Sequence, residues 1–171
     1  GVIGSPWGDV TNCNNYGDLT FIAKYKSAIV NHLSYIGGIA GSDYYAKSQS
    51  ESSIINCVNE GNITIDCDCG TSNNAAGGII GWPGKESSCT NVTENCVNKG
   101  NIVVSGEGKF RLGGIQGGSG IIKGCTNEGS ITVNSSNSAS NYGGLAGFHS
   151  GGYELINSTN TGDIVCNVPI S

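Results

Sequence analysis

The chain has 171 residues, enough for one ordinary domain; 29 of them are glycine and only 12% are charged. The net charge is −5 and the eight Lys and Arg residues are scattered, so no basic stripe could follow nucleic acid phosphates. No apolar run approaches the roughly 18 residues of a transmembrane helix, and no basic amphipathic helix is evident, so we expect no membrane insertion.

A seven-residue element recurs along the chain. Its five copies share an Asn, a Gly and an aliphatic residue at fixed offsets, and they are Cys13–Leu19, Cys57–Ile63, Cys96–Ile102, Cys125–Ile131 and Ser158–Ile164. After each glycine the chain alternates with period two, as in Ile63, Thr64 and Ile65. Period two with β-branched residues predicts strands.

A second, glycine-rich element alternates with the first. Its copies are Gly37–Gly41, Gly77–Gly81, Gly113–Gly117 and Gly143–Gly147, and Gly1–Gly4 resembles a fifth that lacks its first glycine. The second glycines of the four full copies are spaced 40, 36 and 30 residues apart. Constant elements separated by variable lengths are typical of a solenoid whose loops absorb insertions. We therefore expect one repeat array over residues 1–171, cut within a repeat at both ends.

The predicted fold is an all-β parallel solenoid of four to five coils, with about three short strands per coil. One strand precedes and includes the Cys, one carries the Ile-Thr-Val pattern, and one carries Gly-Gly-Ile. We expect three inward rows: Leu19, Ile63, Ile102, Ile131 and Ile164; Phe21, Ile65, Val104, Val133 and Cys166; and Ile39, Ile79, Ile115 and Leu145. A β-propeller is the rival architecture, but its blades would need four strands and steadier repeat lengths.

The Asn-x-Gly within the first element predicts a turn, since both residue types tolerate left-handed backbone. Its asparagines should also stack into an amide ladder at one corner of the coil; they are Asn15, Asn59, Asn98, Asn127 and Asn160. The position after each of these asparagines varies freely, so it should face water.

These elements resemble the GLUG repeat family, named for its Gly-Leu-x-Gly element. The chain carries Gly-Ile-x-Gly three times and Gly-Leu-x-Gly once, at Gly144–Gly147, and the resemblance covers essentially its whole length. Such repeats occur in bacterial surface proteins, including adhesin-like proteins and non-catalytic regions of immunoglobulin A peptidases. The resemblance implies an exported, extracellular or cell-surface region without catalytic residues.

Four of the eight cysteines share one repeat position, namely Cys13, Cys57, Cys96 and Cys125, and Ser158 takes the fifth copy. Because the site accepts serine, we interpret these residues as reduced, stacked core thiols rather than disulfides. Their wide spacing does not fit a zinc site. Outside the column, a disulfide between Cys67 or Cys69 and Cys89 is an open alternative, and the state of Cys166 is not predicted.

The two histidines, His32 and His149, lack any metallopeptidase or triad motif around them. Asp66 and Asp68 could face one side of a strand and hold Ca²⁺ with Asn73 and Asn74, but a solvated loop is the simpler interpretation. We predict no cofactor, no metal and no enzyme activity. A polysaccharide-cleaving β-helix enzyme is the catalytic alternative, and it would need an acidic cluster with a basic partner on one face, which is not evident in the sequence.

Aromatic residues follow successive Gly-x-x-Gly elements within a few positions. The sequence predicts a ligand-binding edge that includes Trp7, Tyr44, Tyr45 and Trp82, because flat aromatic rings suit sugar rings or a protein partner. A glycan or a host or matrix protein is the expected partner, and the function is adhesion or ligand presentation. A purely structural spacer, with these rings buried under loops, is the alternative. We also expect end-to-end self-association through exposed strand edges.

Overall fold

The computed structural model describes residues 1–6, 8–24, 34–42, 52–68, 74–84, 91–135, 140–149 and 153–167. These ranges contain the strands β1 to β21. Within them no helix is long and apolar enough to cross a membrane. Trp7, Tyr44 and Tyr45 of the predicted binding edge lie outside the described residues.

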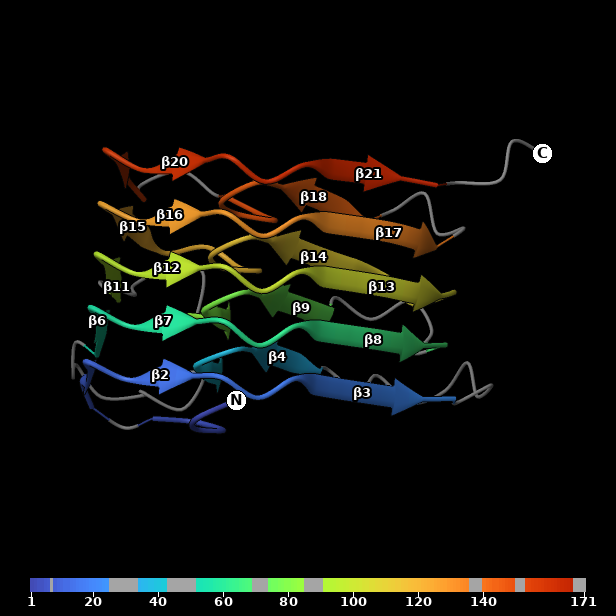
Figure 1. Cartoon of the computed structure of the whole chain (residues 1–171), viewed down its shortest axis with the longest axis horizontal. Helices are drawn as coiled ribbons and strands as arrows, with labels where there is room; N and C mark the ends of the chain where they lie inside the picture. The colour runs from blue at the N-terminus through green and yellow to red at the C-terminus, as the bar shows by residue number, and fades with distance from the viewer. Residues whose placement is uncertain are drawn as a thin grey trace.

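The strands stack into five parallel sheets, and Figure 1 shows them as successive coils rising from the N-terminus to the C-terminus. Sheet 1 contains β1 (Val10–Thr11), β6 (Ser53–Ile55), β11 (Val92–Glu94), β15 (Ile121–Lys123) and β19 (Leu155–Ile156). Sheet 2 contains β2 (Asn14–Asn15), β7 (Val58–Asn59), β12 (Val97–Asn98), β16 (Thr126–Asn127) and β20 (Thr159–Asn160).

Sheet 3 carries the longest strands, β3 (Leu19–Ala23), β8 (Ile63–Cys67), β13 (Ile102–Gly106), β17 (Ile131–Ser135) and β21 (Ile164–Cys166). Sheet 4 contains β4 (Tyr35–Gly37), β9 (Asn74–Gly77), β14 (Phe110–Gly113) and β18 (Asn141–Gly143). Sheet 5 pairs β5 (Ala40–Ser42) with β10 (Ile80–Trp82), and single bridges from Ile3 through Ala146 extend it over every coil. The parallel solenoid is confirmed.

Each of the first four coils contains the three predicted strands, and a bend divides the first and the third of them into two parts. Asn56 separates β6 from β7 with a φ of 54°, and equivalent positive φ values occur at Asn12, Asn95, Gly124 and Asn157. The residue with left-handed backbone therefore comes directly before the Cys. The prediction that it lies within Asn-x-Gly is wrong. Gly61 instead allows two neighbouring coils to approach each other closely, since a Cβ there would lie 2.0 Å from the carbonyl oxygen of Gly17 in the coil below.

The inward rows meet inside the solenoid as two core clusters. In sheet 3, Leu19, Ile63, Ile102, Ile131 and Ile164 are paired in register, and the three interior members are fully buried. Burial of each such aliphatic side chain contributes roughly 1.5–3 kcal/mol. The predicted rows are confirmed for the interior coils, whereas Ile164 and Cys166 of the last coil are exposed.

The predicted amide ladder is confirmed in sheet 2. Asn59 donates from Nδ2 to Oδ1 of Asn98 at 2.8 Å, and Asn98 donates in turn to Asn127 at 2.7 Å. Each amide also donates to the glycine carbonyl two residues ahead, for example Asn98 to Gly100 at 2.9 Å. Asn59, Asn98 and Asn127 are completely buried. The ladder thus satisfies polar groups inside the stack and fixes the register of the coils.

Candidate functional site

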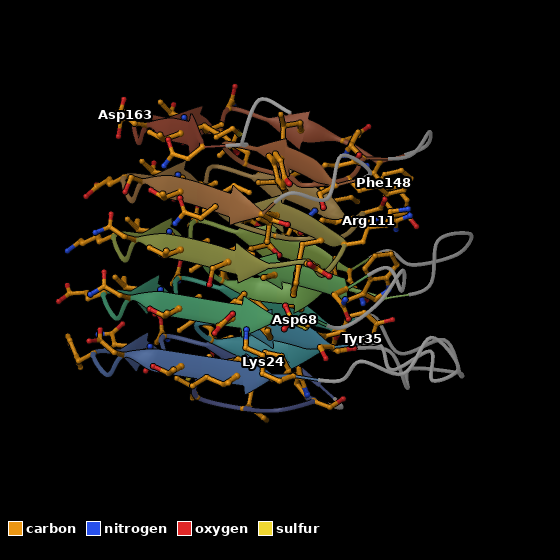
Figure 2. The ribbon with its side chains drawn as sticks, turned by 90° about the vertical axis from the view of Figure 1, so that its right-hand side faces the viewer. Lys24, Tyr35, Asp68, Arg111, Phe148 and Asp163 are labelled. Atoms are coloured by element: carbon orange, nitrogen blue, oxygen red, sulfur yellow. The ribbon has the colours of Figure 1, made fainter. Side chains whose placement is uncertain are left out.

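A stack of aromatic rings and one arginine crosses several coils along one edge of the solenoid. The rings of Tyr35 and Trp82 are stacked with centroids 5.6 Å apart and planes inclined by 25°. Arg111 Cζ lies 5.2 Å from the centroid of the Trp82 ring and 3.9 Å from that of Phe148. Figure 2 shows Tyr35, Arg111 and Phe148 along this edge. We call these four residues the aromatic ladder.

The strand register explains why these side chains meet. Tyr35, Ala75 and Arg111 are in register on sheet 4, and Trp82 and Phe148 each follow the last glycine of a Gly-x-x-Gly element. Two small residues make room for the indole of Trp82 between Tyr35 and Arg111. Ala75 is fully buried, and a Cβ on Gly118 would lie 2.4 Å from Cε3 of Trp82.

Trp82 forms the buried centre of the ladder and exposes only 6% of its surface. Its Nε1 is buried, and no hydrogen-bond acceptor reaches it among the described residues. Tyr35, Arg111 and Phe148 are partly exposed. The ladder can therefore do two things: it cross-links coils through ring and cation–π contacts, and it offers parts of two aromatic rings to a ligand.

Of the predicted binding residues, the structure describes only Trp82, and it brings this residue together with Tyr35 and Arg111, which the sequence analysis did not single out. The sequence does contain a pattern from which Tyr35 and Arg111 could have been found. Each stands two residues before the first glycine of a Gly-Gly pair, so alignment of the repeats on these glycines would have placed them in one column. The complete predicted edge stays a prediction.

A charged cluster lies where sheet 3 ends. Lys24 Nζ contacts Asp66 Oδ1 and lies 3.4 Å from Asp68 Oδ2, and Figure 2 shows Lys24 and Asp68 on the same face. The sequence analysis did not expect an acidic pair with a basic partner on one face, so this cluster is a correction. The hydrogen bond with Asp66, joined by Asp68, raises the pKa of Lys24 above its usual value. A lysine held in its charged form is a poor general base.

Of the proposed Ca²⁺ ligands, Asp66 and Asp68 both contact Lys24, whereas Asn74 forms hydrogen bonds elsewhere. Asn74 is buried, and its amide accepts the N–H of Ser34 at 3.0 Å and donates to the carbonyl of Lys109 at 3.1 Å. Asn73 lies outside the described residues. Among those described, no group of three or more His, Cys, Asp or Glu side chains could hold a metal ion.

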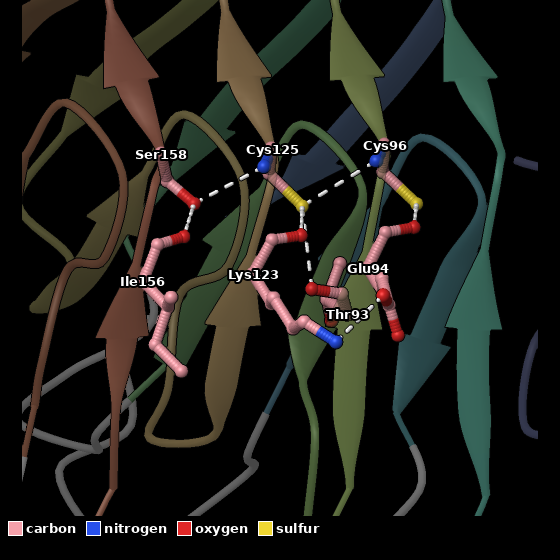
Figure 3. A network of polar contacts seen from close by, with 7 residues as sticks. All are labelled: Thr93, Glu94, Cys96, Lys123, Cys125, Ile156 and Ser158. Atoms are coloured by element: carbon pink, nitrogen blue, oxygen red, sulfur yellow. Dashed lines mark hydrogen bonds and ion pairs between the residues drawn. The ribbon is translucent and has the colours of Figure 1, made fainter.

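The repeated cysteines form a thiol ladder inside the solenoid (Figure 3). The backbone N–H of Cys57 donates to Sγ of Cys96 at 3.4 Å, and that of Cys96 donates to Sγ of Cys125 at 3.4 Å. Ser158 continues the ladder and accepts the N–H of Cys125 at 3.1 Å. All four cysteines of the predicted column, Cys13 included, are free thiols.

Within this ladder, side-chain hydrogen bonds with Cys125 and Cys57, together with burial, raise the pKa of Cys96, so it remains a protonated thiol. Since Cys57, Cys96 and Cys125 are buried inside the solenoid, we assign the ladder a structural role. Outside it, Cys67 is disulfide-bonded, and its partner lies outside the described residues.

No protein-family model matches the chain, and no curated protein matches it significantly. Among solved structures, the chain is similar to one described as a "putative immunoglobulin A1 protease" from Bacteroides ovatus. The identity is 19%, the TM-score is 0.45, and the match covers 90% of this chain and 50% of that one. The chain thus spans half the length of that structure, and a likeness at this level carries no argument about activity.

Proposed function

We propose that this chain is a non-catalytic repeat region of an exported bacterial cell-surface protein that serves adhesion or ligand presentation along the edge marked by the aromatic ladder. The observation that carries the proposal is the continuous stack of Tyr35, Trp82, Arg111 and Phe148 across the coils. The surface location and bacterial source rest on the resemblance to GLUG repeats.

The proposed ligand is a glycan or a host or matrix protein. The partly exposed rings of Tyr35 and Phe148 suit the flat face of a sugar or an aromatic side chain, and the guanidinium between them adds a polar contact. Trp82 supports these groups from beneath, because it is buried against Tyr35 and Gly118. The predicted contacts of Trp7, Tyr44 and Tyr45 belong to the same proposal.

The test is binding of the chain to a glycan array and to matrix proteins, repeated with Tyr35→Ala and Phe148→Ala. Each substitution should weaken binding by about ten-fold or more, as expected for an aromatic anchor. Tyr16→Ala is the control, because Tyr16 is a tyrosine that is 69% exposed and lies beside sheet 2, outside the aromatic ladder. Equal loss in all three variants, or binding that survives loss of both ladder rings, would contradict the site.

A structural spacer is the second candidate, and the burial of Trp82 favours it. In that case the ladder only clamps the coils, and the chain binds nothing in either assay. For the catalytic alternative, glycan turnover by the chain that is lost on Asp66→Asn or Asp68→Asn would establish an enzyme at the Lys24 cluster.

A further inference from the structure

The outer face of sheet 4 carries positive charge, although the chain as a whole has a net charge of −5. Phe110 and Leu112 of β14 point into the core. Side chains alternate along a strand, so Lys109 and Arg111 point outward, and both are partly exposed. The four strands of sheet 4 contain no Asp or Glu. This face therefore presents two cations and no carboxylate from its own strands.

Lys109 also differs from the other lysines whose positions are described. Lys24, Lys99 and Lys123 each contact a carboxylate of a neighbouring coil. Within the part of the chain that the structure describes, no carboxylate lies close enough to Lys109 Nζ to form an ion pair. The charge of Lys109 is therefore available to an anionic ligand.

Arg111 is held between two aromatic rings. Trp82 and Phe148 occupy the same repeat position two coils apart, and Gly118 holds that position in the coil of Arg111. The guanidinium fits into the space that Gly118 leaves, with Cζ 3.9 Å from the centroid of the Phe148 ring. Contact with ring faces leaves the edges of the guanidinium for hydrogen bonds. Because a guanidinium has five N–H donors, Arg111 can keep a partner within the chain and still donate to a ligand.

We propose that the aromatic ladder and Lys109 bind a glycan that carries carboxylate groups. This inference rests on the proposed function and names the class of its ligand. A carboxylate matches the edge of the Arg111 guanidinium in a bidentate pair, and Lys109 adds a second charge on the same face. The partly exposed rings of Tyr35 and Phe148 pack against the apolar face of the sugar. An acidic peptide would match the two cations but would not use the flat rings beside them.

The first experiment compares acidic glycans with their own methyl esters. The probes are a galacturonate trimer, a hyaluronan tetrasaccharide and sialyllactose, each titrated into the chain by calorimetry. At least one acid should bind about ten-fold more tightly than its ester, because esterification removes the charge that Arg111 and Lys109 recognise. Added salt should weaken binding of the acid and leave binding of the ester unchanged.

The second experiment uses Lys109→Gln, which removes one charge without changing the stacked rings. The affinity for the acid should fall about three- to five-fold, and the affinity for the ester should not change. Lys123→Gln is the matched control, because it also removes one lysine charge from the outer surface of a strand, but in sheet 1. It should leave both affinities unchanged, and circular dichroism checks that both variants fold.

Three results would overturn the acidic glycan. They are equal binding of acids and esters, equal effects of Lys109→Gln and Lys123→Gln, and a poly-glutamate peptide that binds as tightly as the best acidic glycan. In each case the site of the proposed function would stand if Tyr35→Ala still weakens binding. A chain that binds none of the three acids, but binds a neutral glycan or a matrix protein through Tyr35, would also overturn the acidic ligand alone. A chain that binds nothing would overturn both proposals.

Discussion

Gly78 lies directly against the side-chain amide of Asn98, which belongs to the next coil. A Cβ on Gly78 would be 2.2 Å from Cγ of Asn98 and 2.2 Å from the carbonyl oxygen of Gly114. The same contact recurs between Gly38 and Asn59, at 2.3 Å. The two repeated elements therefore interlock between coils, and this explains why both the second glycine and the asparagine recur while the loops between them vary.

Gly78→Ala should destabilise the chain by about 3 kcal/mol, because the methyl group has no free space and backbone atoms must move. Gly8→Ala is the control, since a Cβ there meets nothing within 4 Å. Urea denaturation followed by circular dichroism measures both. Equal midpoints for the two variants would show that the glycine pairs do not hold the coils in contact.

Asn98→Ala should cost about 3 kcal/mol, because it leaves the buried amides of Asn59 and Asn127 without one partner each. Asn160→Ala at the exposed end of the same ladder should cost about 1 kcal/mol or less, since water replaces the lost bonds. The difference between the two free energies of unfolding is the readout. A ladder without energetic coupling would give the same small loss at both positions.

Cys96→Ser should lower the free energy of unfolding by about 1 kcal/mol, and Cys96→Ala should lower it more. Serine keeps the hydrogen bonds that Ser158 makes in the last coil, whereas alanine leaves a cavity. Urea denaturation measures both variants.

In the native chain, a thiol reagent should label exposed Cys166 and leave buried Cys96 unmodified until unfolding. Peptide mapping by mass spectrometry follows both sites. Rapid native labelling of Cys96 would contradict a closed thiol ladder.

Gly118→Ala should displace the Trp82 ring, since the new methyl group would overlap the indole, and it should shift the tryptophan fluorescence towards that of an exposed indole. In a double-mutant cycle, Trp82→Ala should absorb most of the cost of Gly118→Ala, because the clash disappears with the ring. Additive losses of stability would mean that the two residues do not touch.

The inward rows of the core could be predicted from the sequence, whereas most of the aromatic ladder could not. Rows such as Ile63, Ile102 and Ile131 followed from a period-two pattern, because identical residues in stacked coils face the same way. The left-handed residue before each Cys escaped prediction although Asn56 and Gly124 are of the two types that tolerate this backbone, because the Asn-x-Gly turn that begins three residues later contains the same two types. The contact of Arg111 with Trp82 escaped because it joins two different repeat columns and depends on the small residues Ala75 and Gly118, which carry no pattern of their own.

The parallel stack places equivalent residues of successive coils one strand spacing apart. Spin labels at Thr20 and Val165, which face outward from the first and last strands of sheet 3 and are joined through register pairs in β8, β13 and β17, test it most directly. Four strand spacings predict a narrow distance of about 19 Å between the labelled backbones. A broad distribution, or a distance well beyond this value as separate propeller blades would give, would contradict the solenoid.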